Sequence, residues 1–176
     1  MSIDPQELRR AMSAVPAAVS VVTTLAPDGS PRGFTATSVV SLSLAPPLVL
    51  VCVGRSNTSH REFVRGRGFA VNVLGTQHPS VAARFAREPA GIRFADGSFT
   101  LSPDGFPVLP DAVVQLSCER HEVLDGGDHD ILIGRVVEIG GTAGDALVYG
   151  RRQYLSLSQL PPCPVSATAV SEGLSA

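Results

Sequence analysis

The chain has 176 residues, a length that fits one domain with a sizeable core. Its 14 basic residues are all arginines spread along the sequence, and with 16 acidic residues they give a formal net charge of −2. This balance offers no electrostatic attraction for nucleic acid or for a lipid surface. The absence of lysine excludes Schiff-base chemistry and a lysine acting as a tuned base.

The termini and the cysteines predict a soluble, cytoplasmic protein. The first residues carry acids and a proline where a secretory leader would carry positive charge and an apolar core. The longest apolar run, 48–53, is far shorter than the roughly 20 residues that cross a bilayer. The three cysteines lie far apart, and their odd number argues against a disulfide framework; they are Cys52, Cys118 and Cys163.

The predicted elements begin with a short amphipathic helix over residues 5–15. Leu8, Met12 and Val15 share one face of it, which we expect to lie against a sheet. A hairpin follows over 18–25 and 32–38, because the sequence Pro27-Asp28-Gly29 between these runs is typical of a turn.

Further along the chain, strands dominate. The runs that predict them are 48–53, 69–74, and a second hairpin of 112–123 and 131–139 across Gly126-Gly127. Two helices, near 59–65 and 79–87, are too short and too irregularly placed for repeated βαβ units, so an antiparallel barrel is predicted. The Pro- and Ser-rich segment 161–176 lacks periodicity and is predicted to be a flexible tail after a domain of residues 1–160.

The most informative segment runs from Gly33 to Leu48. It interleaves small hydroxyl-bearing residues with apolar ones, contains no charge and ends in a Pro-Pro pair before an apolar strand. This pattern suits a wall that holds a large, flat ligand through hydrogen bonds. An ordinary half-buried strand rich in Thr and Ser explains the same pattern equally well.

The segment 55–62 combines a helix start with groups that bind anions. Ser59 and Glu62 have capping-box spacing, and amides of the first turn would point outward beside hydroxyls, an amide and the guanidinium of Arg55. The alternative is a solvated helix start that needs its cap for stability. Segment 55–62 comes directly after the hydroxyl-rich segment, and this position favours the anion-binding hypothesis and a nucleotide-like ligand.

Two glycines at 126–127 permit a tight reversal and place His129 at the start of a strand, where its ring could contact a ligand. The alternative is a turn histidine held by Asp128 or Asp130.

Cys118 and His121 have a metal-like spacing, but strand alternation places them on opposite faces, so no metal site is predicted. No Gly-x-Ser-x-Gly elbow occurs, which leaves hydrolase chemistry without support.

Taken together and in order, these segments resemble the flavin reductase family, the small reductase components of two-component flavin-dependent monooxygenases. The likeness runs from about residue 8 to residue 157. The segments that carry it are Ser-Leu-Ser-Leu-Ala-Pro-Pro-Leu (41–48), Arg-Ser-Asn-Thr-Ser (55–59), Phe-Ala-Val-Asn-Val-Leu (69–74), Arg-Phe-Ala-Arg (84–87), Gly-Asp-His (127–129) and Ile-Gly-Arg-Val (133–136).

The resemblance implies a mainly β fold: an antiparallel, Greek-key-like split β-barrel with a few short peripheral helices. It also implies a homodimer with flavin sites near the subunit interface. The implied activity is an NAD(P)H:flavin oxidoreductase that reduces exchangeable FMN or FAD by hydride transfer and supplies it to a separate monooxygenase. We expect FMN on the basis of the short chain and the single anion-binding segment, and NADH rather than NADPH as the default donor. The alternatives are a non-catalytic flavin-binding or flavin-sensing protein and an interaction domain without a ligand.

The resemblance also implies site residues at matching positions. The isoalloxazine ring would lie along Thr37, Ser38, Val39, Val40 and Ser41, with Cys52 on the next strand. The phosphate would lie near Arg55, Ser56 and Thr58, with Phe85 and Arg87 completing that side. His129 matches the family histidine that contacts the nicotinamide, and Tyr149, Arg152 and Tyr154 would flank the pocket. The chain departs from the family pattern at Val39, where an aromatic residue often stands, and at Arg55, where lysine is frequent.

Overall fold

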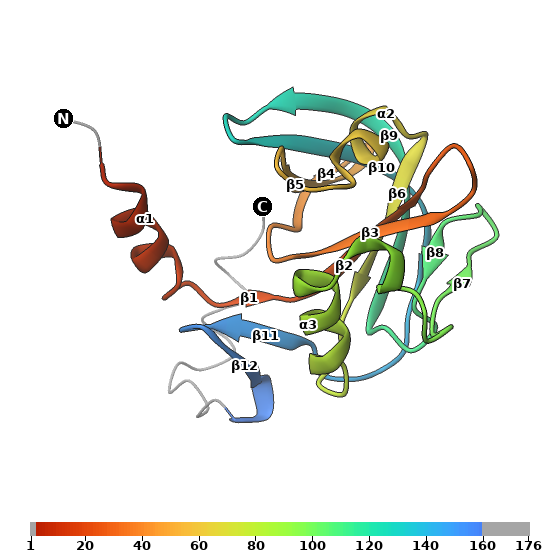
Figure 1. Ribbon diagram of the computed structural model, residues 1–176. Coiled ribbons are helices and arrows are strands. Elements are labelled where there is room, and N and C mark those ends of the chain that lie inside the picture. Colours follow the sequence, from red (N-terminus) through yellow and green to blue (C-terminus); the bar gives the residue numbers. More distant parts are fainter. Residues whose placement is uncertain (1–2, 160–176) are drawn as a thin grey trace.

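The computed structural model describes residues 3–159, and a seven-stranded antiparallel sheet forms the body of the fold within them (Figure 1). The strand order is β3-β2-β6-β9-β10-β5-β4. The predicted mainly β, antiparallel class is therefore confirmed. The strands are β2 (Ser20–Leu25), β3 (Pro31–Ala36), β4 (Val40–Leu44), β5 (Pro47–Gly54), β6 (Gly68–Val73), β9 (Val114–Asp125) and β10 (His129–Gly140).

Smaller elements surround this sheet. The other strands are β1 (Ala17–Ala18), β11 (Leu147–Gly150) and β12 (Gln153–Ser156) in one sheet, and β7 (Thr100–Leu101) and β8 (Pro107–Val108) in another. The helices are α1 (Pro5–Met12), α2 (His60–Arg65), α3 (Pro79–Arg87) and two 3₁₀ turns, η1 (Ala90–Ile92) and η2 (Leu157–Gln159). None of the helices in residues 3–159 is long and apolar enough to span a bilayer. Cys163 and the predicted tail lie outside the described residues.

The alternation along β5 shows how the sequence builds the core and leaves one face free for a site. Val49, Val51 and Val53 are buried, whereas the residues between them are only partly buried, as the two-residue period of a strand requires. The three valines pack in one cluster with Phe63 and Phe69. Cys52, between two of them, faces the opposite side of the sheet.

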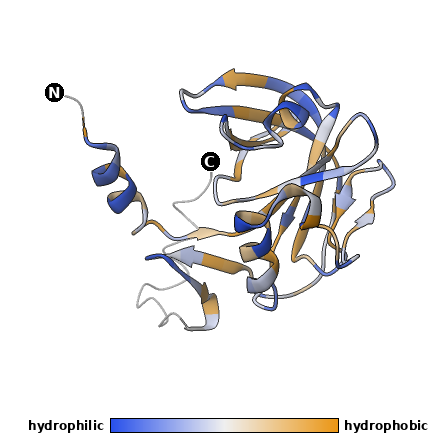
Figure 2. Cartoon of the chain, in the orientation of Figure 1, coloured by the Kyte–Doolittle hydropathy of each residue, from blue (hydrophilic) through white to orange (hydrophobic). Residues whose placement is uncertain are grey.

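The first helix forms as predicted, but its expected packing against a sheet is wrong. α1 ends at Met12 and projects away from the sheets (Figure 1), and Leu8 and Met12 are 56% and 57% exposed. The physical reason is composition: most of α1 is hydrophilic (Figure 2), and with Leu8 and Met12 as its only large apolar side chains it has too narrow an apolar stripe to cover a sheet. β1 anchors this segment instead, through pairing of Ala17 and Ala18 with β11.

The predicted capping box at α2 does not form. Ser59 is the N-cap residue, yet its side chain makes no capping hydrogen bond, and its buried Oγ has no partner within the described part of the chain. Asn57 organises this turn instead, because its Oδ1 accepts the Ser59 N–H at 2.9 Å. The helix start is therefore held by a turn before the helix.

Cys118 and His121 of β9 have different surroundings. Cys118 is fully buried, and burial raises the pKa of its thiol to about 12, whereas His121 is exposed. Residues 3–159 contain no cluster of three or more His, Cys, Asp or Glu side chains that could hold a metal ion.

The turn between β11 and β12 carries strain that substitution should relieve. Arg151 and Arg152 both have positive φ, 50° and 64°, in a two-residue hairpin turn that favours Asn-Gly. The left-handed conformation costs a side-chain-bearing residue about 1–2 kcal/mol. We expect the double variant Arg151→Asn, Arg152→Gly to raise the free energy of unfolding by about that amount in urea titrations. The control variant Arg151→Gln, Arg152→Gln removes the same charge but keeps the backbone strain. If it raised the free energy of unfolding by the same amount, the effect would be due to charge.

Candidate functional site

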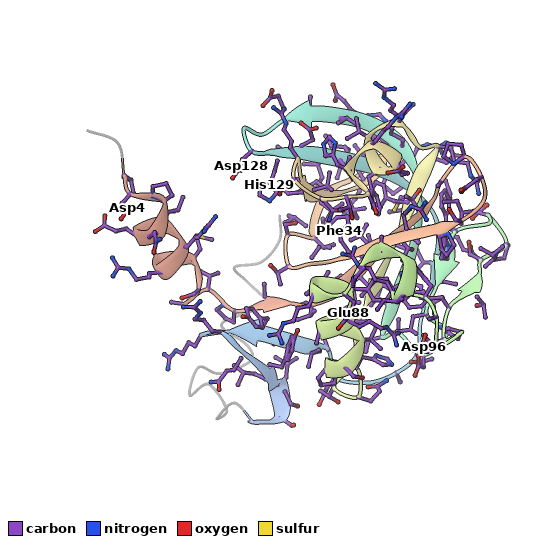
Figure 3. All side chains as sticks on the ribbon, viewed as in Figure 1. Asp4, Phe34, Glu88, Asp96, Asp128 and His129 are labelled. Atoms are coloured by element: carbon purple, nitrogen blue, oxygen red, sulfur yellow. The ribbon has the colours of Figure 1, made fainter. Side chains whose placement is uncertain are left out.

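A cavity of about 440 Å³ opens between β3, β5, the turn before α2, the end of α3 and the start of β10. This volume lies within the range of about 300–1,000 Å³ typical of small-molecule sites. Figure 3 shows His129 at the tip of the β9–β10 hairpin, on the same side of the molecule as Phe34 of β3. The lining residues are Phe34, Thr35, Ala36, Thr37, Ser38, Cys52, Gly54, Ser56, Asn57, Phe85, Ala86, Arg93 and His129.

Six of the predicted site residues meet in this cavity, although they come from segments far apart in the sequence. They are Thr37, Ser38, Cys52, Ser56, Phe85 and His129. Ser38 also fixes its own segment, because its Oγ accepts the backbone N–H of Cys52 at 3.0 Å. The hydroxyl-rich segment that leaves β3 is thereby held against β5.

The other predicted residues lie outside the lining. Val39 packs against the core cluster, and Val40 and Ser41 are exposed on β4, which forms the sheet edge beyond β5. The structure thus brings only the first two residues of the predicted five-residue wall to the cavity. The remaining predicted residues are Thr58, which is exposed, Arg87 at the end of α3, and Tyr149, Arg152 and Tyr154 on the β11–β12 hairpin.

Arg55 is held by two carboxylates instead of lining the cavity. Its Nη2 lies 2.7 Å from Oδ1 of Asp130 and 2.9 Å from Oδ2 of Asp125. These contacts raise the pKa of Arg55, and the Arg55 and His60 hydrogen bonds lower the pKa of Asp130. Because the charge of Arg55 is compensated locally, its contribution here is to join the end of β5 to the β9–β10 hairpin.

The lowered pKa of Asp130 predicts a pH dependence of stability at the acid end. The native pKa lies below the unfolded value of about 3.9, so the ionised Asp130 stabilises the fold above about pH 4. This contribution is lost as the pH falls through the native pKa. Asp130→Asn should therefore show a shallower fall in the free energy of unfolding between about pH 5 and pH 2. Urea titrations across that range test this, and parallel acid limbs in the two proteins would contradict it.

Arg93 supplies the positive charge of the cavity, although it is not among the site residues predicted from the sequence. Its Nη1 donates to the Gly33 carbonyl at 2.6 Å and its Nε to the Glu88 carbonyl at 2.8 Å. Within residues 3–159 it forms no ion pair with a carboxylate, and burial lowers the pKa of its guanidinium. A half-buried cation without a counter-charge is a natural partner for an anionic ligand group.

A cluster of aromatic rings positions the segment that carries Arg93. The centroid of the Phe94 ring lies 4.9 Å from that of Phe85 and 5.0 Å from that of Phe99, and both pairs have edge-to-face geometry. Phe85 in turn packs closely on β3, since a Cβ added to Gly33 would lie 2.8 Å from its ring. The three phenylalanines at positions 85, 94 and 99 are the sequence signal that could have drawn attention to this segment.

His129 stands at the mouth of the cavity, at the start of β10. It pairs with Gly54 of β5, and a Cβ on Gly54 would lie 3.4 Å from its Nε2, so the ring covers that glycine. Its Nδ1 is 2.7 Å from Oδ1 of Asp128, which lowers the pKa of Asp128. The half-exposed ring is thus oriented through Nδ1, while Nε2 makes no hydrogen bond within the part of the chain that the structure describes.

The family of this chain follows from its sequence over almost the whole described length. Residues 12–158 match the model of the flavin reductase like domain. The chain belongs to the flavin reductase family. Every lining residue of the cavity in this flavin reductase falls inside the matched range, whereas most of α1 precedes it.

Three relatives show how close the similarity is. The NADH:riboflavin 5'-phosphate oxidoreductase of Streptomyces pristinaespiralis is 41% identical over 156 residues, which are 87% of this chain and 88% of the relative. The NADH:FAD oxidoreductase SgcE6 of Streptomyces globisporus, solved with NAD and FAD fragments, is 32% identical with a TM-score of 0.82, covering 94% and 99% of the two chains. A nitrilotriacetate monooxygenase component B homolog from Mycobacterium thermoresistibile is 29% identical with a TM-score of 0.81, covering 93% of both chains.

Proposed function

We propose that this flavin reductase transfers a hydride from NADH to a flavin held in the cavity, and that the reduced flavin then serves a separate monooxygenase. The observation that carries the proposal is the meeting, in one cavity, of hydroxyl-bearing residues, the uncompensated guanidinium of Arg93 and the half-exposed ring of His129. The names of the relatives support it, since they specify NADH, riboflavin 5'-phosphate or FAD, and a monooxygenase component.

The lining residues fit a flavin nucleotide, FMN or FAD. Thr37 and Ser38 offer hydroxyls and backbone amides to the polar edge of a ring, and Phe85 offers an apolar wall. Arg93, with Ser56 and Asn57 across the cavity, offers a cation and hydrogen-bonding groups to a phosphate. FMN is our first choice, because Arg93 is the one cation among the lining residues.

The chemistry of this reaction explains why no nucleophile is needed. A bound flavin supplies the ring that accepts the hydride. The protein must therefore place two ring systems close together and exclude other orientations. We assign His129 to contact the nicotinamide at the cavity mouth, and the donors at Thr37 and Ser38 to favour the negative charge that builds up on a reduced ring.

We further propose that the functional unit is a homodimer. β4 is an edge strand whose apolar side chains Val40, Leu42 and Leu44 are exposed, Leu44 to 83%. An exposed apolar edge strand is a favourable surface for association with a second copy. Sedimentation of the purified protein should give the mass of two chains, and a monomer at micromolar concentration would refute this part of the proposal.

The experiment that tests the activity is steady-state oxidation of NADH with added FMN, FAD or riboflavin. We expect the rate to depend on the added flavin, to be highest with FMN and to fall when NADPH replaces NADH. A purified protein with no flavin-stimulated rate would overturn the proposal. Tight FMN binding without NADH oxidation would favour the non-catalytic flavin-binding alternative, and unchanged flavin fluorescence on titration would favour an interaction domain.

A further inference from the structure

A second cavity, of about 560 Å³, lies between the β2–β3 turn and the C-terminal end of α2. It shares no lining residue with the flavin cavity. Figure 1 shows the β2–β3 turn at the far end of the sheet from the β9–β10 turn that carries His129. Its apolar lining includes Leu25, Pro27 and Phe106. The cavity therefore offers a separate concave surface that the proposed reaction does not use.

The rim of this second cavity carries positive charge that the protein leaves uncompensated. Arg61 and Arg65 are four residues apart on α2, so they share one helix face, and both line the cavity. In residues 3–159, neither side chain forms an ion pair or a hydrogen bond. Two exposed like charges at this spacing repel each other, and a bound anion would relieve that repulsion.

The remaining polar groups extend the same pattern. Arg67 lies over the ring of Phe106, at 4.3 Å from its centroid, and donates to the Asp104 carbonyl, which fixes a third cation at the cavity. Glu62 is the sole carboxylate among the lining residues, and its buried Oε2 has no hydrogen-bond partner in the described chain. Three cations and one carboxylate thus give this cavity a net positive charge, in a chain whose net charge is −2.

We propose that this second cavity binds a small organic anion with an apolar ring, such as the phosphate monoester of an aromatic compound. The ring would pack against Leu25 and Pro27, and the phosphate would be held by Arg61 and Arg65. The concave, partly apolar lining favours a small molecule over a flat protein or nucleic-acid surface, which would use the arginines alone.

The test uses 1-naphthyl phosphate as the probe, titrated by calorimetry into the full chain with FMN present at saturation to fill the first cavity. We expect saturable binding of one probe per chain. 1-Naphthol lacks the charge and inorganic phosphate lacks the ring, so each should bind at least about tenfold more weakly, since losing one charge-assisted contact or the ring burial costs at least 1.4 kcal/mol. Inorganic phosphate that binds as tightly as the probe would reduce the site to an arginine pair and overturn the proposal.

Matched variants locate the binding. Arg61→Gln, Arg65→Gln should weaken the probe at least about tenfold and leave FMN affinity unchanged, whereas Arg151→Gln, Arg152→Gln removes the same charge elsewhere and should leave the probe affinity unchanged. Arg93→Gln changes the first cavity and should also leave the probe affinity unchanged. This variant shows that the probe binds in the second cavity even if the protein does not bind FMN. Circular dichroism checks that each variant is folded. Equal probe affinity in the wild type and the Arg61, Arg65 variant would overturn the proposal.

Discussion

Replacing Arg93 with glutamine is expected to weaken FMN binding by about 10- to 100-fold while leaving riboflavin binding within about twofold. A hydrogen bond to a charged group contributes about 1.5–3 kcal/mol, and riboflavin has no phosphate to accept it. Arg93 is the one cation among the lining residues, and no carboxylate of residues 3–159 pairs with it. Fluorescence titration of both flavins measures the two affinities in parallel.

The control for Arg93 is Arg87→Gln, which removes an arginine that ends α3 outside the cavity lining. It should leave both affinities unchanged. Arg55→Ala offers a second comparison, because the sequence predicts a phosphate role for it, whereas its side chain pairs with Asp125 and Asp130. Arg55→Ala should therefore affect FMN and riboflavin alike. A selective loss of FMN in Arg55→Ala but not in Arg93→Gln would return the phosphate role to Arg55.

His129→Ala is expected to lower the rate of hydride transfer, or the affinity for NADH, by about 10- to 100-fold, with flavin affinity mostly retained. The ring stands at the cavity mouth and is oriented through Nδ1, so its loss would leave the nicotinamide less well placed, and small misplacements cost large factors in rate. Stopped-flow mixing of the FMN-loaded protein with increasing NADH separates the two effects. A defect dominated by flavin release would show that His129 holds the flavin.

Asp128→Asn tests how His129 is oriented. The substitution keeps the size of the side chain and removes the carboxylate 2.7 Å from Nδ1. We expect a defect of the same kind as in His129→Ala but smaller, because the ring remains and loses part of its orientation. In Gln77→Ala, which changes an exposed residue outside the cavity lining, the rate should equal that of the wild type.

The six strands of the main sheet other than β4, the two predicted hairpin turns and the two short internal helices follow from local patterns in the sequence, whereas β4 and the short strands β1, β7, β8, β11 and β12 were not predicted. β5 shows the two-residue alternation of valines that predicts it, and α3 occupies residues 79–87 as expected. The Pro27-Asp28-Gly29 turn forms with Gly29 at φ 81°. These features are set by neighbouring residues, so the sequence alone is enough to predict them. The sequence motifs likewise indicate the flavin reductase family, and the match of residues 12–158 to the family model confirms it.

The partners of the charged side chains could not be predicted in this way. Arg55 follows an apolar strand beside hydroxyl residues, which suits an anion site, but Asp125 and Asp130 arrive from 70 and more residues later in the chain and pair with it. No anion-binding motif surrounds Arg93, and the packing of Phe94 against Phe85 accompanies the hydrogen bond from Arg93 to the Gly33 carbonyl of β3. α1 has an amphipathic pattern, yet the fold gives it no sheet to cover.

What the sequence by itself determined is therefore the family, the antiparallel class and the segments from which a site is built. The tertiary structure decided which side chains of those segments face the cavity and which arginine keeps its charge available. The physical reason is that backbone conformation depends mainly on near neighbours and periodicity. The state of a charge depends instead on whichever groups the fold brings within a few ångströms of it.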